Sequence, residues 1–143
     1  MKQLLLILFC CAAGIASSQA PVVFINTGSR APYGTNQELT IGINGQCKYY
    51  LKEVNGPIKD SSSFSISATQ LDSLFTKARQ LGFFSLNNSY HSTKVDGGGV
   101  YISMNHNGDK KRVDVRNTDV PAINELMAWV NGMLAPRGIS IKF

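Results

Sequence analysis

The chain has 143 residues with 14 lysines and arginines and 9 aspartates and glutamates, which gives a formal net charge of +5. This length suits one domain and excludes a chain of several large domains. The basic excess is mild and does not by itself indicate nucleic acid as a partner.

The first residues are typical of a secretory signal peptide. Lys2 precedes an apolar run over residues 4–11, and small residues follow up to Ala20. The run is too short to span a bilayer comfortably. We expect a signal peptide over 1–18 with cleavage after Ser18, because the alternative cut after Ala20 would lie next to a proline. The domain is therefore predicted to be exported, to the periplasm or the outside of the cell.

The cysteines agree with export to a bacterial envelope. A lipid anchor on Cys10 is disfavoured, because a phenylalanine and not a small residue precedes it. Loss of the signal peptide leaves Cys47 as the last cysteine, so no disulfide forms within the chain. A domain of about 125 residues can be stable on its hydrophobic core alone.

Residues 19–36 contain prolines, glycines and small polar residues, and they are predicted to form an irregular arm that could include a short strand over 22–25. Residues 37–143 are predicted to form a single α+β domain. We find no internal repeat and no low-complexity tract.

Alternation of apolar and polar residues over 38–54 predicts a first β-hairpin, with its turn at an Asn-Gly pair. A two-residue turn would put the apolar residues of the two strands on opposite faces. A turn of odd length, with Gly45 in the left-handed conformation, places Ile41 opposite Cys47 or Tyr49. Because each apolar side chain gains about 1.5–3 kcal/mol on burial, we expect the odd-length turn.

The polar stretch over 55–65 is interpreted as a connection to the clearest helix, which lies within residues 66–84. Ser67 is a good N-cap, and Gln70 completes a capping box. Gly82 suits the left-handed position that follows a helix. The apolar stripe of this helix consists of Leu71, Leu74, Phe75, Ala78 and Leu81.

Residues 99–116 predict a second hairpin with a tight type I′ turn at Asn107-Gly108. This turn sets apolar residues opposite one another, in the pairs Val100–Val115 and Ile102–Val113, and it places Met104 opposite Lys111.

Residues 121–134 predict the second helix, because Pro121 is tolerated in a first helical turn and Pro136 ends the pattern. Its buried stripe consists of Ile123, Leu126, Met127, Val130 and Leu134. The alternation of Ile139, Ile141 and Phe143 predicts a short last strand.

This order predicts an α+β fold of the type ββαββα, in which two hairpins form a four-stranded antiparallel sheet. Two amphipathic helices need one surface to cover, so both are expected on one face of the sheet. The other face is expected to be open to solvent.

The stretch from Leu39 to about Val130 resembles a family of small exported bacterial domains of unknown function. The resemblance is carried by the two Asn-Gly turns, Ile66-Ser67 and Leu71, the segment 83–86, Tyr90, Asp96, Lys111, Val113 and Pro121. Residues 33–36 stand where many members have a turn with cysteine and proline. The resemblance implies the fold and export, and it implies no activity.

The open face is the first candidate binding site. It is expected to present basic and aromatic side chains, namely Lys48, Tyr50, Lys52, Tyr101, Lys110 and Arg112. Tyrosine and arginine are enriched at binding hot spots, and clustered positive charge favours anionic partners. The alternative is an ordinary solvated face, on which lysines keep sheet edges from pairing.

The second candidate is the loop that contains Tyr90, His91 and Asp96, which would serve a small hydrolase or a ligand pocket. Alternatively, Asp96 only stabilises the loop, and the glycines at 97–99 allow a tight bend into the next strand.

No metal or cofactor site is predicted, because neither histidine, His91 or His106, has further ligands at metal-binding spacing. Nucleophilic catalysis needs a nearby base, and Cys47 falls on a predicted inward position. We therefore predict an exported, non-catalytic binding or interaction domain. Its expected partner is an unknown protein or an anionic ligand of the envelope, and export argues against nucleic acid.

Overall fold

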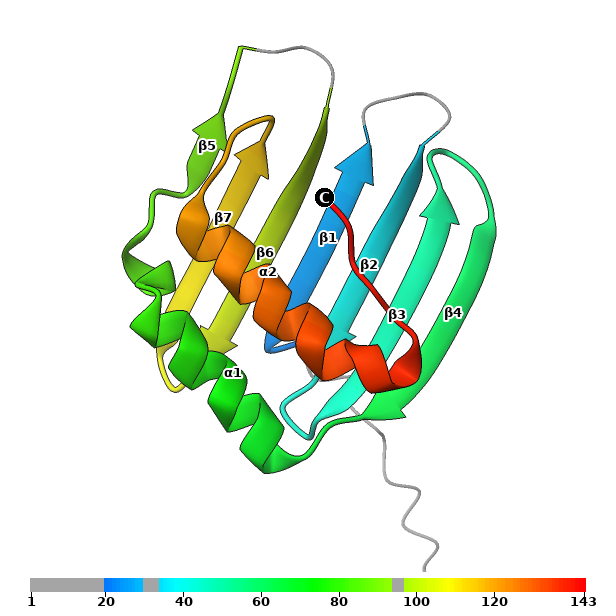
Figure 1. The fold of residues 1–143 in the computed structure, drawn as a ribbon. Coiled ribbons are helices and arrows are strands. Elements are labelled where there is room, and N and C mark those ends of the chain that lie inside the picture. Colours follow the sequence, from blue (N-terminus) through cyan, green and yellow to red (C-terminus); the bar gives the residue numbers. More distant parts are fainter. Residues whose placement is uncertain (1–19, 30–33, 94–96) are drawn as a thin grey trace, which may run out of the picture.

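The computed structural model describes residues 20–29, 34–93 and 97–143, which form one sheet covered by two helices. The sheet has the strand order β4-β3-β2-β1-β6-β7-β5. Both helices lie on the same face of this sheet (Figure 1). The strands are β1 (Val23–Ser29), β2 (Thr35–Ile41), β3 (Gln46–Glu53), β4 (Ile58–Ser65), β5 (Ser89–His91), β6 (Gly98–His106) and β7 (Asp109–Arg116). The helices are α1 (Ala68–Gln80) and α2 (Pro121–Leu134), with short 3-10 turns η1 (Phe83–Ser85) and η2 (Ala135–Arg137).

The predicted α+β class is confirmed, and the first hairpin has the expected odd-length turn. Ile41 lies opposite Cys47. The Gly42 amide donates to the Gln46 carbonyl at 2.8 Å, which closes the turn. Gly45 has a φ of 77°, the left-handed conformation that the register demands.

The second hairpin has the tight turn that the apolar pairing predicts. Asn107 and Gly108 both have positive φ, at 50° and 87°, as a type I′ turn requires. The cross-strand pairs are Val100–Val115, Ile102–Val113 and Met104–Lys111, as predicted.

The capping box of α1 is also confirmed. The Gln70 amide donates to Ser67 Oγ at 3.1 Å, and the Ser67 amide donates to Gln70 Oε1 at 2.9 Å. Gly82 follows the helix with a φ of 68°. The buried residues of α1 are Leu71, Leu74, Phe75 and Ala78, and Leu81 is partly buried.

The prediction of a four-stranded sheet is wrong, because three further strands take part. The most important is β1, within the segment predicted to be an irregular arm. It is the middle strand of the sheet and pairs with both β2 and β6. Val23 and Ile25 are fully buried beneath the helices. The short strand over 22–25 that the arm could include thus corresponds to the first part of β1, but an apolar Phe24 on the opposite face breaks the alternation that would have indicated a sheet strand.

The two edge strands were not predicted for different reasons. β4 is mostly polar, but its backbone pairs with β3 along the stretch interpreted as a connection, with Phe64 opposite Cys47. β5 has three residues and pairs with β7 in parallel, so the sheet is mixed and not wholly antiparallel. Edge strands face solvent along one side and need few apolar residues, which removes their hydrophobic pattern.

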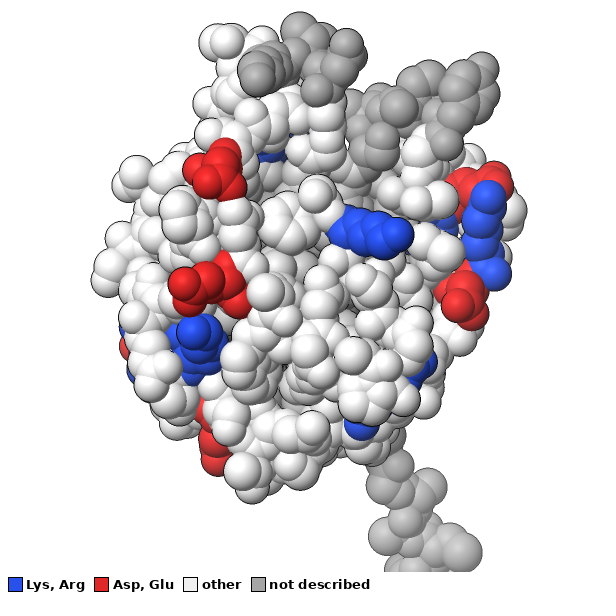
Figure 2. Space-filling view, viewed as in Figure 1, with Lys and Arg blue, Asp and Glu red and all other residues white. Residues whose placement is uncertain are grey.

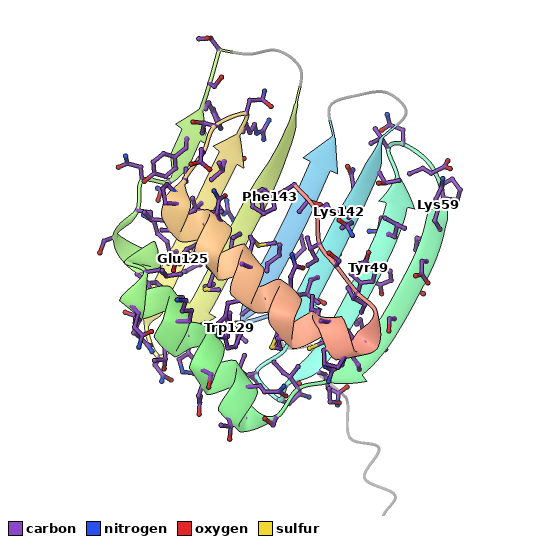
Figure 3. The ribbon with its side chains drawn as sticks, in the orientation of Figure 1. Tyr49, Lys59, Glu125, Trp129, Lys142 and Phe143 are labelled. Carbon is purple, nitrogen blue, oxygen red and sulfur yellow. The ribbon has the colours of Figure 1, made fainter. Side chains whose placement is uncertain are left out.

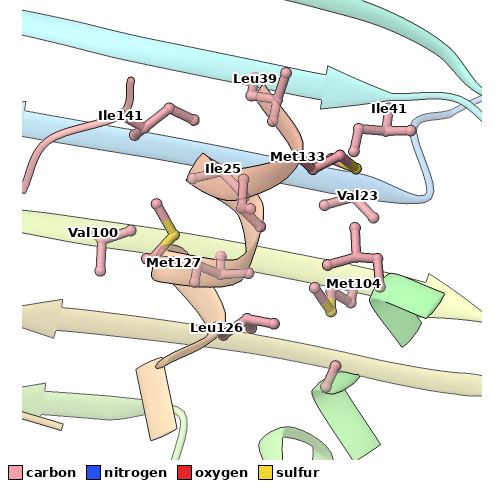
Figure 4. Close-up of a cluster of buried hydrophobic side chains, with 14 of the residues drawn as sticks. Val23, Ile25, Leu39, Ile41, Val100, Met104, Leu126, Met127, Met133 and Ile141 are labelled. Atoms are coloured by element: carbon pink, nitrogen blue, oxygen red, sulfur yellow. The ribbon is translucent and has the colours of Figure 1, made fainter. Parts of the chain in front are cut away.

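The core lies between the sheet and the helices. Side chains from α2 and the C-terminal segment meet those of β1, β2 and β6, as Figure 4 shows. The residues of this contact include Val23, Ile25, Leu39, Ile41, Met104, Leu126, Met127 and Ile141.

The predicted last strand does not form within residues 138–143, which cross the helix-covered face in front of β1 and β2 (Figure 3). Ile139 and Ile141 are buried, but Phe143 is 48% exposed. We call residues 138–143 the C-terminal strap.

Two side-chain amides hold the strap in the way that neighbouring strands would. Gln37 on β2 donates to the Ser140 carbonyl and accepts from the Lys142 amide, both at 2.7 Å. Asn131 on α2 donates to the Ile141 carbonyl at 2.9 Å and accepts from its amide at 2.8 Å. The strap is therefore extended and hydrogen-bonded without belonging to the sheet.

Candidate functional site

Neither helix covers the second face of the sheet, and the six predicted binding residues lie on this open face. Cys47 and Tyr49 are buried beneath the helices, so the residues between and beyond them on β3 face away. The register carries the same side across the sheet, from Lys48 through Thr40 to Phe24 and then through Ser103 to Arg112.

The six residues do not form one patch, because β2 and β1 separate β3 from β6. Three strand spacings of about 4.8 Å put roughly 14 Å between the two groups. The group on β3 consists of Lys48, Tyr50 and Lys52, and the group on β6 and β7 consists of Tyr101, Lys110 and Arg112. We call all six the basic face.

Phe24 on β1 lies between the two groups and contacts the one on β6 and β7, and the sequence prediction did not include it. Its ring meets the Tyr101 ring edge to face, with centroids 5.8 Å apart. The Arg112 guanidinium lies 5.4 Å from the centroid of Tyr101. These contacts form an aromatic cluster with a cation beside it, which is a composition typical of binding surfaces.

The charges of the basic face are only partly compensated. Lys52 pairs with Glu38 on β2 at 3.1 Å and lies 5.1 Å from the Tyr50 ring. Among the described residues, Lys48, Lys110 and Arg112 form no ion pair, and all three are exposed. By contrast, the helix-covered face in Figure 2 is mostly uncharged, with acidic and basic residues scattered over it. In the part of the chain that the structure describes, three cations without acidic partners therefore face solvent on the open side.

A hollow of about 200 Å³ indents the open face at the end of the sheet opposite the hairpin turns. Gly28 on β1 and Gly99 on β6 are directly opposite one another, and their backbones contribute to its lining. We call it the glycine hollow. Polar side chains from four strands surround it, namely Asn26, Asn36, Tyr101, Asp114 and Arg116.

Asp114 and Arg116 form an ion pair with several short contacts on the open face. Arg116 Nε donates to both Asp114 carboxylate oxygens, at 3.0 and 3.1 Å, and a terminal nitrogen lies 2.9 Å from Oδ2. Burial by itself raises the pKa of Asp114. The hydrogen bonds and charge of Arg116, with a smaller effect of His91, outweigh burial and hold the pKa below its usual value.

Two residues of the predicted loop site, Tyr90 and His91, lie on opposite faces of the sheet. Tyr90 packs against the core on the helix-covered side, and its hydroxyl accepts from the Asn87 amide at 3.0 Å. His91 is the next residue of β5 and lies on the open face. Asp96 lies outside the described residues. The structure therefore does not bring Tyr90 and His91 into one pocket.

A serine, a histidine and an aspartate do meet at the edge of the open face, but without the geometry of a catalytic triad. Ser89 Oγ lies 3.0 Å from His91 Nε2 and 3.4 Å from Nδ1, so its shorter contact is with Nε2, and Asp114 Oδ2 lies 3.4 Å from the same Nε2. A triad needs the acid on one ring nitrogen and the nucleophile on the other. In this arrangement Asp114 does not orient the imidazole toward the serine.

The side chains of Cys47 and His106 are engaged in packing, Cys47 in the core and His106 against an aromatic ring. Burial raises the pKa of the Cys47 thiol to about 11, and the charge of Arg137 only partly offsets this effect. The thiol is therefore neutral and enclosed, whereas a nucleophile needs an accessible thiolate. The His106 ring stacks on Phe75 with centroids 4.1 Å apart.

Within the described ranges, no group of three or more His, Cys, Asp or Glu side chains is placed to hold a metal ion. The same part of the chain has no helix long and apolar enough to cross a membrane.

Comparison with known proteins identifies a family. The family model described as a domain of unknown function (DUF6438) matches residues 29–134, which is most of the chain. The predicted resemblance to a domain of unknown function is thereby confirmed, while export and a bacterial origin stay predictions. No curated protein matches the chain.

Proposed function

The chain belongs to the family of the domain of unknown function DUF6438, whose description names no activity, and we propose from the geometry of its open face that it is an exported binding module. The partner is an extended anionic ligand of the cell envelope, or an acidic protein surface. The sheet carries the binding residues, and the helices on the other side support it.

One observation carries the proposal: among the described residues, three exposed cations without acidic partners share an uncovered sheet face with aromatic rings, and one of them, Arg112, lies beside the ring of Tyr101. Lys48 lies on β3, and Lys110 and Arg112 lie on β7. Four strand spacings, about 19 Å, separate these strands. A small anion cannot reach both groups, so the arrangement favours a ligand with repeated negative charge. Phe24 on β1 and Tyr101 on β6 lie between Lys48 and the two cations of β7, and they offer apolar contact.

The test compares two triple variants of residues 20–143 on immobilised heparin, used as a generic anionic polymer. The first variant combines Lys48→Gln, Lys110→Gln and Arg112→Gln. The second removes three positive charges from elsewhere, through Lys77→Gln on α1, Lys111→Gln on the helix-side register of β7 and Lys142→Gln in the strap. Because the two variants have equal net charge, a difference between them reports position and not total charge.

We expect the open-face variant to elute at clearly lower salt than the wild type, and the second variant to elute near the wild type. Uncharged dextran should retain none of them. Equal losses in the two variants would mean that heparin responds to net charge alone, and the open face would then have no special role.

Export is tested separately, by expressing the complete chain in a Gram-negative bacterium and measuring the intact mass of the periplasmic protein. The expected product begins at Gln19, and a product that begins at Pro21 would instead support cleavage after Ala20. Recovery of the uncleaved chain from the cytoplasm would contradict export.

A further inference from the structure

Gly28 is a residue that the fold does not require to be glycine. It is part of β1, the middle strand, and its φ does not lie in the left-handed region. A Cβ at this position would meet nothing closer than Asn36 Oδ1 at 3.5 Å, an ordinary van der Waals contact. Glycine within a strand weakens it by roughly 0.5–1 kcal/mol relative to alanine. The missing side chain therefore costs stability and opens the glycine hollow.

Gly99 lies directly opposite, and there the packing of β7 requires a glycine. A Cβ at this position would lie 2.6 Å from the Val115 carbonyl oxygen and 3.2 Å from Arg116 Cγ. The close approach of β7 thus excludes a side chain there. With Gly28 beside it, the two strands expose adjacent bare backbone at the base of the hollow.

The polar side chains that line the hollow are electrically balanced. Asn26 and Tyr101 are paired across β1 and β6, and Tyr101 is paired with Asp114 across β6 and β7. Asp114 is already neutralised by Arg116. A bound anion would face the carboxylate, and a bound cation would face the guanidinium, so the site offers little net attraction to either.

These groups suit a neutral molecule that carries several hydroxyls. Amide, carboxylate and guanidinium groups each form two hydrogen bonds in one plane, and neighbouring hydroxyls of a sugar ring both donate and accept. Tyr101 adds an aromatic ring beside the polar groups. The Asn36 Oδ1 atom is buried without a hydrogen-bond partner among the described residues, which leaves an acceptor at the rim next to Gly28. A hollow of about 200 Å³ admits one ring and not a large cofactor.

We propose that the glycine hollow is a binding site for a single neutral sugar ring, either free or as one unit of a longer glycan. This site lies beside the basic face and shares Tyr101 with it, but it does not depend on the cations at Lys48 and Lys110. The two proposals can therefore fail separately.

The test is a titration of uniformly ¹⁵N-labelled protein, residues 20–143, with glucose, galactose and N-acetylglucosamine, followed by NMR. Glucuronate, sodium sulfate and N-acetylglycinamide are titrated in parallel as an acidic sugar, an inorganic anion and a neutral peptide analogue. A ligand of this size supports a Kd of about 1 mM. We expect at least one neutral sugar to shift the backbone amides of Gly28 and Gly99 and the side-chain amide of Asn26 in a saturable manner.

The matched variants are Gly28→Thr, which fills the hollow, and Ser63→Thr, which adds a methyl group to the open face at β4. Gly28→Thr should raise the Kd at least about tenfold, whereas Ser63→Thr should leave it unchanged. Thermal unfolding of both variants checks that the fold is retained, and Gly28→Ala replaces Gly28→Thr if threonine unfolds the domain.

Three results would overturn the assignment. The first is that no neutral sugar gives saturable shifts at the hollow. The second is that sulfate, glucuronate or N-acetylglycinamide binds there more tightly than every neutral sugar, which would indicate an anion or peptide site. The third is that filling the hollow at position 28 leaves sugar binding intact.

Discussion

At the scale of single residues, several glycines have distinct physical roles. Gly45 and Gly82 both adopt left-handed backbone, with φ of 77° and 68°. A Cβ on Gly45 would in addition overlap the Ile66 carbonyl oxygen, whereas a Cβ on Gly82 would meet nothing within 4 Å. The two positions therefore separate the cost of backbone conformation from the cost of a steric clash.

The first prediction compares Gly45→Ala with Gly82→Ala by chemical unfolding. Gly82→Ala should lower the free energy of unfolding by about 1 kcal/mol, the usual cost of left-handed backbone for a residue with a Cβ. Gly45→Ala should lower the free energy of unfolding by about 1–3 kcal/mol more than Gly82→Ala does, because the turn must move away from Ile66, just before α1. Equal losses at the two positions would mean that the contact between this turn and Ile66 relaxes without cost.

The second prediction concerns the pH dependence of the ion pair between Asp114 and Arg116. The pKa of Asp114 is lower in the folded state than in the unfolded chain, where it is about 3.9. A depressed pKa contributes stability above the unfolded value, and this contribution is lost as the pH falls through the folded value. Because Arg116 is 45% exposed, we expect no more than about 1 kcal/mol.

The measurement is the free energy of unfolding of the wild type and of Asp114→Asn between neutral pH and pH 3. The wild type should be more stable at neutral pH, and the difference should shrink as the pH falls below about 4. High salt should reduce the difference at neutral pH. A difference that is constant across the range would contradict a contribution from the ionised carboxylate.

At the scale of elements, the sequence predicts what local rules determine. The turn at Gly45 follows from the need to place Ile41 and Cys47 on one face, and the helix start follows from Ser67 and Gln70. Each of these signals lies within a few residues of the element that it defines. β4 lacks such a signal because its residues are mostly polar, although its partner β3 is the preceding strand. The strap lacks one because the side chains that hold it, Gln37 and Asn131, belong to β2 and α2.

The third prediction tests the two hydrogen bonds by which Asn131 holds the strap. Asn131→Ala removes both hydrogen bonds to Ile141 and leaves a partly buried amide and carbonyl unpaired. We expect a loss of about 1–3 kcal/mol in the free energy of unfolding. Asn124→Ala on the exposed side of α2 is the control, because it makes the same change of residue type and removes only a surface hydrogen bond to Asp119 and none to the strap.

Hydrogen exchange at the Ile141 amide locates the effect. In Asn131→Ala this amide should exchange faster, while amides of β6 should change only as much as global stability changes. Unaltered protection at Ile141 would show that Gln37 and apolar packing hold the strap without Asn131.

At the scale of the whole molecule, both candidate sites depend on β1, for which the sequence predicts only a short strand over 22–25 inside an irregular arm. The glycine hollow joins Gly28 to Gly99, residues that are far apart in sequence and adjacent only because β1 lies between β2 and β6. The same insertion places Phe24 between the two halves of the basic face. The residues of the open face could therefore be predicted from alternation, but their arrangement could not.

The family match begins at residue 29 and ends at residue 134, so its bounds leave out nearly all of β1 and the whole strap. In a chain cut to these bounds, β2 and β6 would lose their shared neighbour β1, and each would expose a row of unpaired backbone groups. Val23, Ile25 and Ile141 would also be missing from the core. Their burial is worth about 1.5–3 kcal/mol each, which is comparable in sum to the stability of a typical domain.

The fourth prediction is that a shortened chain of residues 29–134 does not fold, whereas residues 20–143 do. Circular dichroism should show a cooperative thermal transition for the longer chain alone, and the shorter chain should aggregate through its unpaired strands. Residues 20–134 provide the intermediate case, because this chain keeps β1 and lacks the strap. If it folds with reduced stability while residues 29–134 do not fold, then β1 is the strand that makes the two halves of the sheet one cooperative unit. A cooperative transition in residues 29–134 would instead mean that β2 and β6 pair directly, and the glycine hollow would then be absent from the minimal fold.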